Sequence, residues 1–123
     1  MKKILTLIFV LFAFESVAIE KKTTFTIEAF NEAQKTGKII VINSWNKSCG
    51  TCALQTKILN VAQKDFPDVL FLSYEQTKHK DIAKLLNVNF WATIIIYKNS
   101  KEVVKEIGVT SKSDIYSLIK KEI

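Results

Sequence analysis

Residues 41–52 of this 123-residue chain read Val-Ile-Asn-Ser-Trp-Asn-Lys-Ser-Cys-Gly-Thr-Cys. The β-branched run over residues 39–42 is typical of a strand that is buried on both faces of a sheet. From Gly50 onward, apolar residues recur at helical spacing as far as Lys64. This stretch therefore predicts a central strand that leads, through a short polar loop, into a helix whose start carries two cysteines.

The rest of the chain alternates between strand and helix patterns. Apolar residues make up 48% of the sequence, which is enough for a packed core and excludes wholesale disorder. We expect strands at residues 23–27, 38–44, 69–72, 93–97 and 102–107, and helices at residues 28–36, 50–64, 78–87 and 111–122. This order, β-α-β-α-β-α-β-β-α, predicts an α/β fold with a central mixed β-sheet flanked by helices. No linker or repeat interrupts it, so residues 19–123 should form one domain.

The first 18 residues are organised like a secretory signal peptide. Lysines follow Met1, an apolar run covers residues 4–14, and Ser16-Val17-Ala18 offers small residues where a signal peptidase cleaves. A spanning helix needs about 20 apolar residues, and Glu15 interrupts this run too early. We expect cleavage near Ala18 and a periplasmic or secreted protein. The alternatives are an uncleaved anchor in the inner membrane through residues 4–14, and a buried N-terminal helix or strand.

Cys49 and Cys52 lie at the start of the helix that follows the central strand. Unpaired backbone N–H groups and the helix dipole favour negative charge there, so a thiolate at Cys49 would be stabilised. Because Cys52 lies nearly one turn further on, the two sulfur atoms can meet in a small disulfide ring. We expect Cys49 to be the exposed attacking thiol and Cys52 the more buried resolving thiol. Gly50 would allow close approach of a partner chain, and the Thr51 hydroxyl could donate to the thiolate.

Two other interpretations of the cysteine pair stay open. The pair could supply half of a tetrahedral zinc site, but there is no second pair and His79 is the only histidine. We therefore predict neither a metal nor another cofactor. A purely structural disulfide also fits an oxidising compartment, although a loop this short removes little chain entropy from the unfolded state. The position between a buried strand and a helix favours a redox role.

Together these residues resemble the thioredoxin family over nearly all of residues 23–123. Trp45 falls where the family often has an aromatic residue, and residues 90–99 are similar to its cis-proline loop and the strand that follows. Residues 106–119 are similar to its last strand, glycine and closing helix. The resemblance implies a thioredoxin-like fold and a thiol–disulfide oxidoreductase that exchanges a Cys49–Cys52 disulfide with protein dithiols of the cell envelope.

The sequence departs from the family pattern near the cysteines. Ser48 stands where thioredoxins usually have tryptophan, and Thr51 replaces a proline. Asn43 occupies the position of the family's buried acid, and an amide cannot accept the proton of the resolving thiol. Ala92 replaces the cis-proline. A cis bond before a non-proline residue costs about 2.5–4 kcal/mol, so the bond before Ala92 should be trans.

Supporting roles in substrate binding are expected for residues around the disulfide. Trp45 and Trp91 could form a substrate ledge near the sulfur atoms, and Asn43, Ala92 and Thr93 would support the site. The departures at Asn43 and Ala92 also motivate an alternative function, a non-catalytic module that binds a metal such as Cu(I) or docks a partner protein.

The expected partners follow from the redox interpretation and from the charge. They are protein thiols and disulfides together with an upstream redox donor or acceptor, and the chain should be a monomer that meets the membrane only transiently, through its signal segment. The formal charge is +6, but all 18 basic residues are lysines spread along the sequence. Nucleic acid is not expected as a partner, because there is no arginine for bidentate recognition of bases or phosphates.

Overall fold

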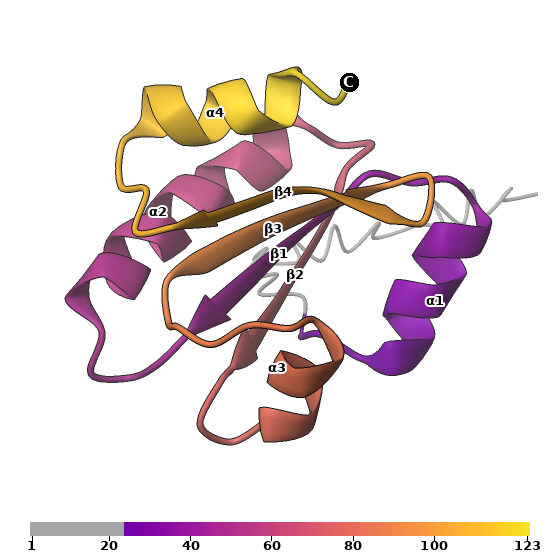
Figure 1. The fold of residues 1–123 in the computed structure, drawn as a ribbon. Helices are drawn as coiled ribbons and strands as arrows, with labels where there is room; N and C mark the ends of the chain where they lie inside the picture. Colours follow the sequence, from indigo (N-terminus) through magenta and orange to yellow (C-terminus); the bar gives the residue numbers. More distant parts are fainter. Residues whose placement is uncertain (1–23) are drawn as a thin grey trace, which may run out of the picture.

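The computed structural model describes residues 24–123, so the predicted signal segment lies outside the described residues. A four-stranded sheet is flanked by helices on both faces (Figure 1). The helices are α1 (Ile27–Lys35), α2 (Gly50–Asp65), α3 (Lys80–Leu85) and α4 (Lys112–Lys120), and the strands are β1 (Ile40–Trp45), β2 (Leu70–Glu75), β3 (Thr93–Lys98) and β4 (Lys101–Ile107). Among residues 24–123, none of the helices is long and apolar enough to span a membrane.

The sheet has the strand order β2-β1-β3-β4 and is mixed. β1 runs parallel to β2, with Trp45 opposite Glu75, and antiparallel to β3. β3 and β4 form the predicted antiparallel hairpin. Because parallel strands end at the same edge of a sheet, the segments that follow β1 and β2 leave it side by side. The expected α/β class is thereby confirmed.

The first predicted strand, residues 23–27, is shorter than expected in the part that is described. Thr24 forms an isolated parallel bridge with Ser73, and the Phe25 N–H donates to the Ser73 carbonyl at 2.8 Å. The chain then turns into α1, because the hydroxyl of the N-cap residue Thr26 accepts from the Ala29 N–H at 3.1 Å. This cap starts the helix at Ile27 and ends the extended segment at Thr26. Within residues 24–123 the sheet consequently has four strands.

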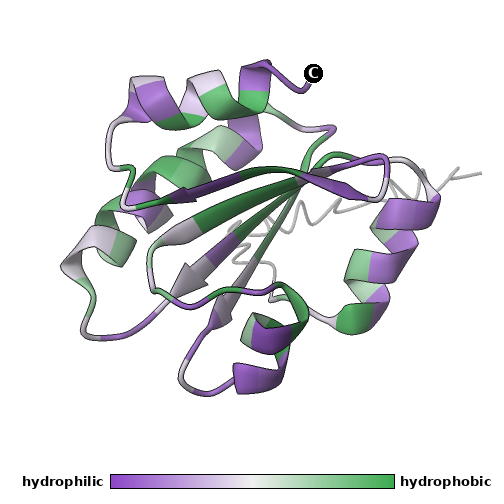
Figure 2. Cartoon of the chain, in the orientation of Figure 1, coloured by the Kyte–Doolittle hydropathy of each residue, from purple (hydrophilic) through white to green (hydrophobic). Residues whose placement is uncertain are grey.

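Two apolar layers cover the two faces of the sheet, and Figure 2 shows the hydrophobic residues on the strands and on the inner sides of the helices. Ile40 and Ile42 of β1 pack on the layer that includes α1 and α3, whereas Val41 packs on the layer that includes α2 and α4. All three side chains are at most 1% exposed. The β-branched run is therefore a central strand buried on both faces, which gives the cysteine loop a rigid support.

Tyr74 of β2 is buried, and its phenol oxygen has no hydrogen-bond partner among the described residues. Burial raises the pKa of Tyr74 to about 12 from its ordinary value of 10, and the nearby Ser44 hydroxyl lowers it by a smaller amount. Between these pH values the folded chain keeps a proton that the unfolded chain has lost. The free energy of unfolding must therefore fall as the pH rises from 10 towards 12.

Replacing Tyr74 by phenylalanine should remove part of this alkaline sensitivity. At neutral pH the free energy of unfolding should be unchanged or about 1 kcal/mol higher, since an unpaired buried hydroxyl is removed. Above pH 10 the variant should lose less stability than the wild type, by on the order of 2 kcal/mol near pH 12. Urea unfolding at several pH values between 9 and 12 measures both effects. If the free energy of unfolding fell equally steeply with pH in the two proteins, the role given to Tyr74 would be contradicted.

Candidate active site

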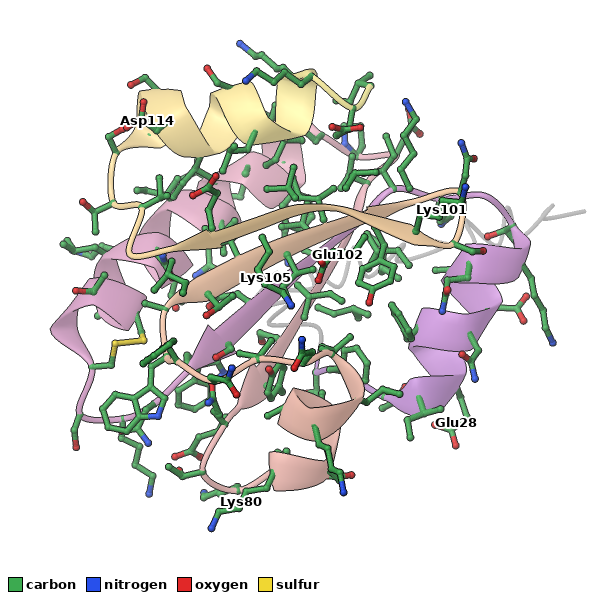
Figure 3. The ribbon with its side chains drawn as sticks, in the orientation of Figure 1. Glu28, Lys80, Lys101, Glu102, Lys105 and Asp114 are labelled. Atoms are coloured by element: carbon green, nitrogen blue, oxygen red, sulfur yellow. A yellow bond between two sulfur atoms is a disulfide. The ribbon has the colours of Figure 1, made fainter. Side chains whose placement is uncertain are left out.

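The two cysteines form a disulfide at the start of α2. Figure 3 shows it as a yellow bond at the end of the sheet away from the hairpin turn that carries Lys101. Cys49 is the N-cap of α2 and is partly exposed, and its Sγ accepts from the Cys52 N–H at 3.1 Å. Cys52 is 2% exposed. One sulfur atom can therefore be reached by a partner, while the other lies inside the protein.

Asn46 holds the loop that leads into the disulfide. Its carbonyl accepts from the Cys49 N–H at 3.2 Å, and its Oδ1 accepts from the Ser48 N–H at 3.0 Å. Its Nδ2 donates to Thr77 Oγ1, also at 3.0 Å, and so ties this loop to the segment after β2. Lys47 and Ser48 are exposed. The loop thus presents Cys49 in a fixed position, with polar side chains around it.

Gly50 and Thr51 lie between the cysteines in the first turn of α2. Gly50 is exposed, and a Cβ added to it would meet no atom within 4 Å. Thr51 is partly exposed. Within the described chain nothing requires glycine at position 50, so the predicted advantage of Gly50 concerns the approach of a partner.

A buried pair of amides lies behind the disulfide. Asn43 Nδ2 donates to Gln55 Oε1 at 3.0 Å, and the two residues are 3% and 0% exposed. Gln55 Nε2 donates to the carbonyls of Ala92 at 3.0 Å and Val109 at 2.9 Å. Gln55 follows Cys52 by three residues and so lies on the same side of α2. This one side chain connects β1, α2, the loop before β3 and the loop after β4.

The importance of Gln55 was missed by the sequence analysis. It stands in the helical pattern among Cys52, Leu59 and Ala62, which are all buried, as one more residue of the inner face. An amide in the apolar stripe of a helix is itself a signal, because buried polar groups need hydrogen-bond partners. The identity of those partners, however, is not encoded near Gln55 in the sequence.

Ala92 occupies a left-handed conformation with a φ of 57°, and the peptide bond that precedes it is trans. The Ala92 N–H donates to the Ser44 carbonyl at 2.9 Å, and its carbonyl accepts from Gln55 Nε2 and from the Gly108 N–H. A left-handed conformation costs about 1–2 kcal/mol for a residue with a Cβ. These three hydrogen bonds offset that cost and hold the loop beside the disulfide without a cis-proline.

Replacing Ala92 by proline, the residue that the family resemblance places there, should destabilise this protein. Proline requires a φ near −65° and has no N–H, so both the local conformation and the bond to Ser44 would be lost. We expect the free energy of unfolding to fall by about 2 kcal/mol, measured by urea unfolding. Ala92→Gly, which tolerates positive φ, serves as the control and should change stability by less than about 1 kcal/mol. A proline variant as stable as the wild type would show that the loop can adopt another conformation.

The loop before β3 also carries two exposed aromatic residues. Phe90 and Trp91 are 61% and 42% exposed, and the Phe90 carbonyl accepts from the hydroxyls of Thr93 at 2.7 Å and Ser44 at 3.3 Å. Thr93 is buried and therefore acts within the protein, by fixing this loop. The loop presents apolar surface at the same end of the sheet as the disulfide.

The two tryptophans predicted to form one ledge lie at different recesses. Trp45 is partly exposed and lines a small cavity of about 30 Å³ with Asn43, between β1, β2 and α2. Trp91 lines a groove beside α3. The two tryptophans therefore line separate recesses, and neither Cys49 nor Cys52 is in the lining of either recess.

No group of three or more histidine, cysteine or carboxylate residues that could hold a metal ion occurs within residues 24–123. His79 is exposed at the N-cap position of α3, and its side chain makes no capping hydrogen bond. A four-coordinate metal bound by Cys49 and Cys52, such as Zn²⁺, would thus have to draw its other ligands from elsewhere, whereas a two-coordinate Cu(I) ion would need only the two thiolates.

Comparison with known sequences identifies the same family as the resemblance of the cysteine segment. Residues 21–121 match the family model described as Thioredoxin. The thioredoxin of Mycoplasma genitalium is 27% identical over 93 residues, which cover 76% of this chain and 91% of that protein. A thioredoxin H-type of Fagopyrum esculentum is 32% identical over 81 residues, which cover 66% of this chain and 70% of that protein.

Solved structures agree in fold. The crystal structure of thioredoxin NaTrxh from Nicotiana alata has a TM-score of 0.71 at 25% identity, covering 77% of this chain and 82% of that chain. Trxlp from Edwardsiella tarda has a TM-score of 0.74 at 24% identity, covering 77% of this chain and 94% of that chain. With a disulfide-bonded Cys-Gly-Thr-Cys at the start of α2 and a family match that spans both layers of the fold, the chain belongs to the thioredoxin family and is a thiol–disulfide oxidoreductase.

Proposed function

We propose that this oxidoreductase exchanges its Cys49–Cys52 disulfide with protein dithiols of the cell envelope, acting as a monomer. The observation that carries the proposal is the asymmetry of the pair: Cys49 is partly exposed, whereas Cys52 is 2% exposed. A disulfide with one accessible sulfur can be attacked by a partner thiolate at that sulfur only, which is the geometry that exchange requires.

The exchange proceeds in two steps that conserve atoms and electrons. A substrate thiolate attacks the Sγ atom of Cys49, a new sulfur–sulfur bond forms to the substrate, and the Cys49–Cys52 bond breaks with its electron pair on Cys52. The second substrate thiolate then attacks the substrate sulfur of this mixed disulfide and releases Cys49 as a thiolate. The substrate leaves oxidised by two electrons and the enzyme is reduced by two. In reverse, the same steps reduce a substrate disulfide, with electrons supplied by an upstream dithiol.

The backbone around the pair stabilises the thiolate that Cys49 carries in the reduced protein. The Cys52 N–H already donates to Cys49 Sγ at 3.1 Å, and the N-terminus of the 16-residue helix α2 favours a negative charge at its N-cap. Behind the pair, Asn43 and Gln55 are neutral amides that already bond to each other. They offer Cys52 no acid–base group, so its proton must be exchanged with solvent or substrate.

The reduction potential of the pair tests this proposal. The protein is equilibrated with glutathione buffers of graded potential, and its free thiols are counted by alkylation and mass spectrometry. A pair that cycles should titrate as a two-electron couple between about −120 and −270 mV, the range of known thiol oxidoreductases. A pair that stays oxidised below about −300 mV would be a structural disulfide, and the proposal would fail.

The alternative function, a module that binds Cu(I) through the two thiolates, predicts a different result. Anaerobic titration of the reduced protein would show stoichiometric uptake of Cu(I), together with no exchange of protein disulfides. Exchange activity that persists with the metal absent would favour the oxidoreductase function.

The proposed location in the cell envelope is supported by the order of features in residues 1–18: a basic start, an apolar run over residues 4–14, and small residues at Ser16 and Ala18. Expression of the full chain in a bacterial host, followed by fractionation and mass spectrometry of the N-terminus, tests it. A mature chain that begins at Ile19 in the periplasmic fraction is expected. An intact N-terminus in the membrane fraction would favour the anchored form instead.

A further inference from the structure

A groove of about 420 Å³ lies beside the disulfide loop, on the α3 side of the sheet. Its walls come from the turn after β2, from α3 and from the loop before β3. They include Gln76, Thr77, Lys80, Lys84, Asn89 and Trp91. The volume is within the range of pockets that hold ligands, and the apolar side chains Ala83, Val88 and Trp91 share the walls with polar ones.

Direct hydrogen bonds join this groove to the active-site loop. Thr77, in the groove wall, accepts from Asn46 Nδ2 at 3.0 Å, and the Asn46 carbonyl accepts from the Cys49 N–H. The Gln76 N–H donates to the Trp45 carbonyl at 2.9 Å. On the other wall, Trp91 immediately precedes Ala92, which is anchored to Gln55 behind the disulfide. A chain bonded to Cys49 would therefore find the groove next to its own flanking residues.

The groove is cationic. Lys80 and Lys84 lie one turn apart on α3, both are exposed, and neither forms a salt bridge with any of residues 24–123. Figure 3 shows Lys80 at the edge of α3. Of the nearby acids, Glu75 is buried and pairs with Lys78 at 3.3 Å, so its charge is already balanced. Between residues 76 and 92 the remaining acid is Asp81, which is absent from the groove lining.

A surface depression on the α4 side of the sheet has a different charge pattern. The surface depression between β4 and α4 is lined by Glu106 and Asp114 together with one lysine, Lys121. Lys105 of β4 contacts the segment that follows α3. Its Nζ donates to the Leu86 and Asn87 carbonyls and forms a salt bridge with Glu102. The groove on the α3 side thus holds two lysines without an ion pair among residues 24–123, and no acid shares its lining with them.

We propose that this groove binds an acidic, extended segment of the substrate protein, next to the substrate cysteine that exchanges with Cys49. Carboxylates of the segment would pair with Lys80 and Lys84, and the amides of Gln76 and Asn89 would bond to its backbone. The inference rests on the proposed exchange function and adds a substrate class to it. Each exposed ion pair between the segment and a lysine is weak. The pairs should therefore mainly raise the rate of encounter with acidic substrates and the selectivity for them.

The test compares peptide substrates that differ only in charge. Disulfide-linked peptide dimers with three glutamates beside the cysteine are compared with dimers that carry three glutamines there, and their reduction by the reduced protein is followed by chromatography of quenched samples. The neutral 2-hydroxyethyl disulfide reports the intrinsic reactivity of Cys49. The variant is Lys80→Glu with Lys84→Glu. The matched control is Lys38→Glu with Lys101→Glu, two lysines near the opposite end of the sheet with the same change in net charge.

We expect the wild type to reduce the acidic peptide about tenfold faster than the neutral one at low salt, with the preference lost at high salt. The groove variant should lose or reverse the preference and still reduce 2-hydroxyethyl disulfide at the wild-type rate, whereas the control should keep the preference. No preference in the wild type, or equal loss in variant and control, would overturn the assignment of the groove but leave the exchange function intact. Failure to reduce any of the disulfides would instead overturn the exchange function.

Discussion

Cys49→Ser is expected to abolish the reduction of protein disulfides, with a fall in rate of at least about a thousandfold. A serine hydroxyl is not ionised at neutral pH and cannot replace the thiolate as nucleophile or as the accessible sulfur of the disulfide. Cys49 alone of the pair is partly exposed, so Cys52 cannot take over its role. Turnover of a model protein disulfide, followed by alkylation of the released thiols, measures the loss.

Cys52→Ser is the matched variant that separates the two roles. It keeps Cys49 and the first step but lacks the thiol that would release the substrate, so a mixed disulfide between Cys49 and the substrate should accumulate. Non-reducing electrophoresis detects this species. Should the mixed disulfide accumulate with Cys49→Ser and not with Cys52→Ser, the assignment of attacking and resolving thiols would have to be exchanged.

Gln55→Leu is expected to lower the free energy of unfolding by about 3–5 kcal/mol. The substitution leaves Asn43 Nδ2 and the Val109 carbonyl without their partner and takes one of two donors from the Ala92 carbonyl. Each buried polar group that loses its partner costs about 1–3 kcal/mol. Urea unfolding of the oxidised proteins measures the change.

Gln63→Leu is the control, because it makes the same substitution on the same helix at a partly exposed position. The Gln63 side chain has no hydrogen bond within residues 24–123, so its replacement should change stability by no more than about 0.5 kcal/mol. Equal effects of the two variants would mean that the buried amide network does not stabilise the protein beyond ordinary packing.

The same network links stability to the active-site surface. Gln55 holds the Ala92 carbonyl, and Ala92 follows the exposed Trp91 in the loop beside the disulfide. In the family pattern this loop is shaped by a cis-proline, whereas here a trans bond, a positive φ at Ala92 and the Gln55 amide shape it. This chain therefore fixes the loop with a trans peptide bond and hydrogen bonds, where the family pattern uses a cis-proline.

The elements that depend on local patterns were predictable from the sequence. The central strand was recognised from residues 39–42 because a continuous β-branched run needs two covered faces, and the helix after it from the spacing of its apolar residues. Of the strand expected at 23–27, the described residues form only a bridge at Thr24, since the cap at Thr26 competes for the same residues. Position at a strand end and a helix start was enough to single out Cys49 and Cys52.

The alternating α/β order and the cysteine pair thus follow from local patterns, because periodicity, capping and the CxxC spacing act over a few residues. The surroundings of the pair depend on how the whole chain folds. Gln55 meets carbonyls 37 and 54 residues further along the chain, and Thr77 meets Asn46 across 31 residues. Such contacts arise when separate loops converge at one edge of the sheet, and no local pattern of residues records which backbone groups will meet there.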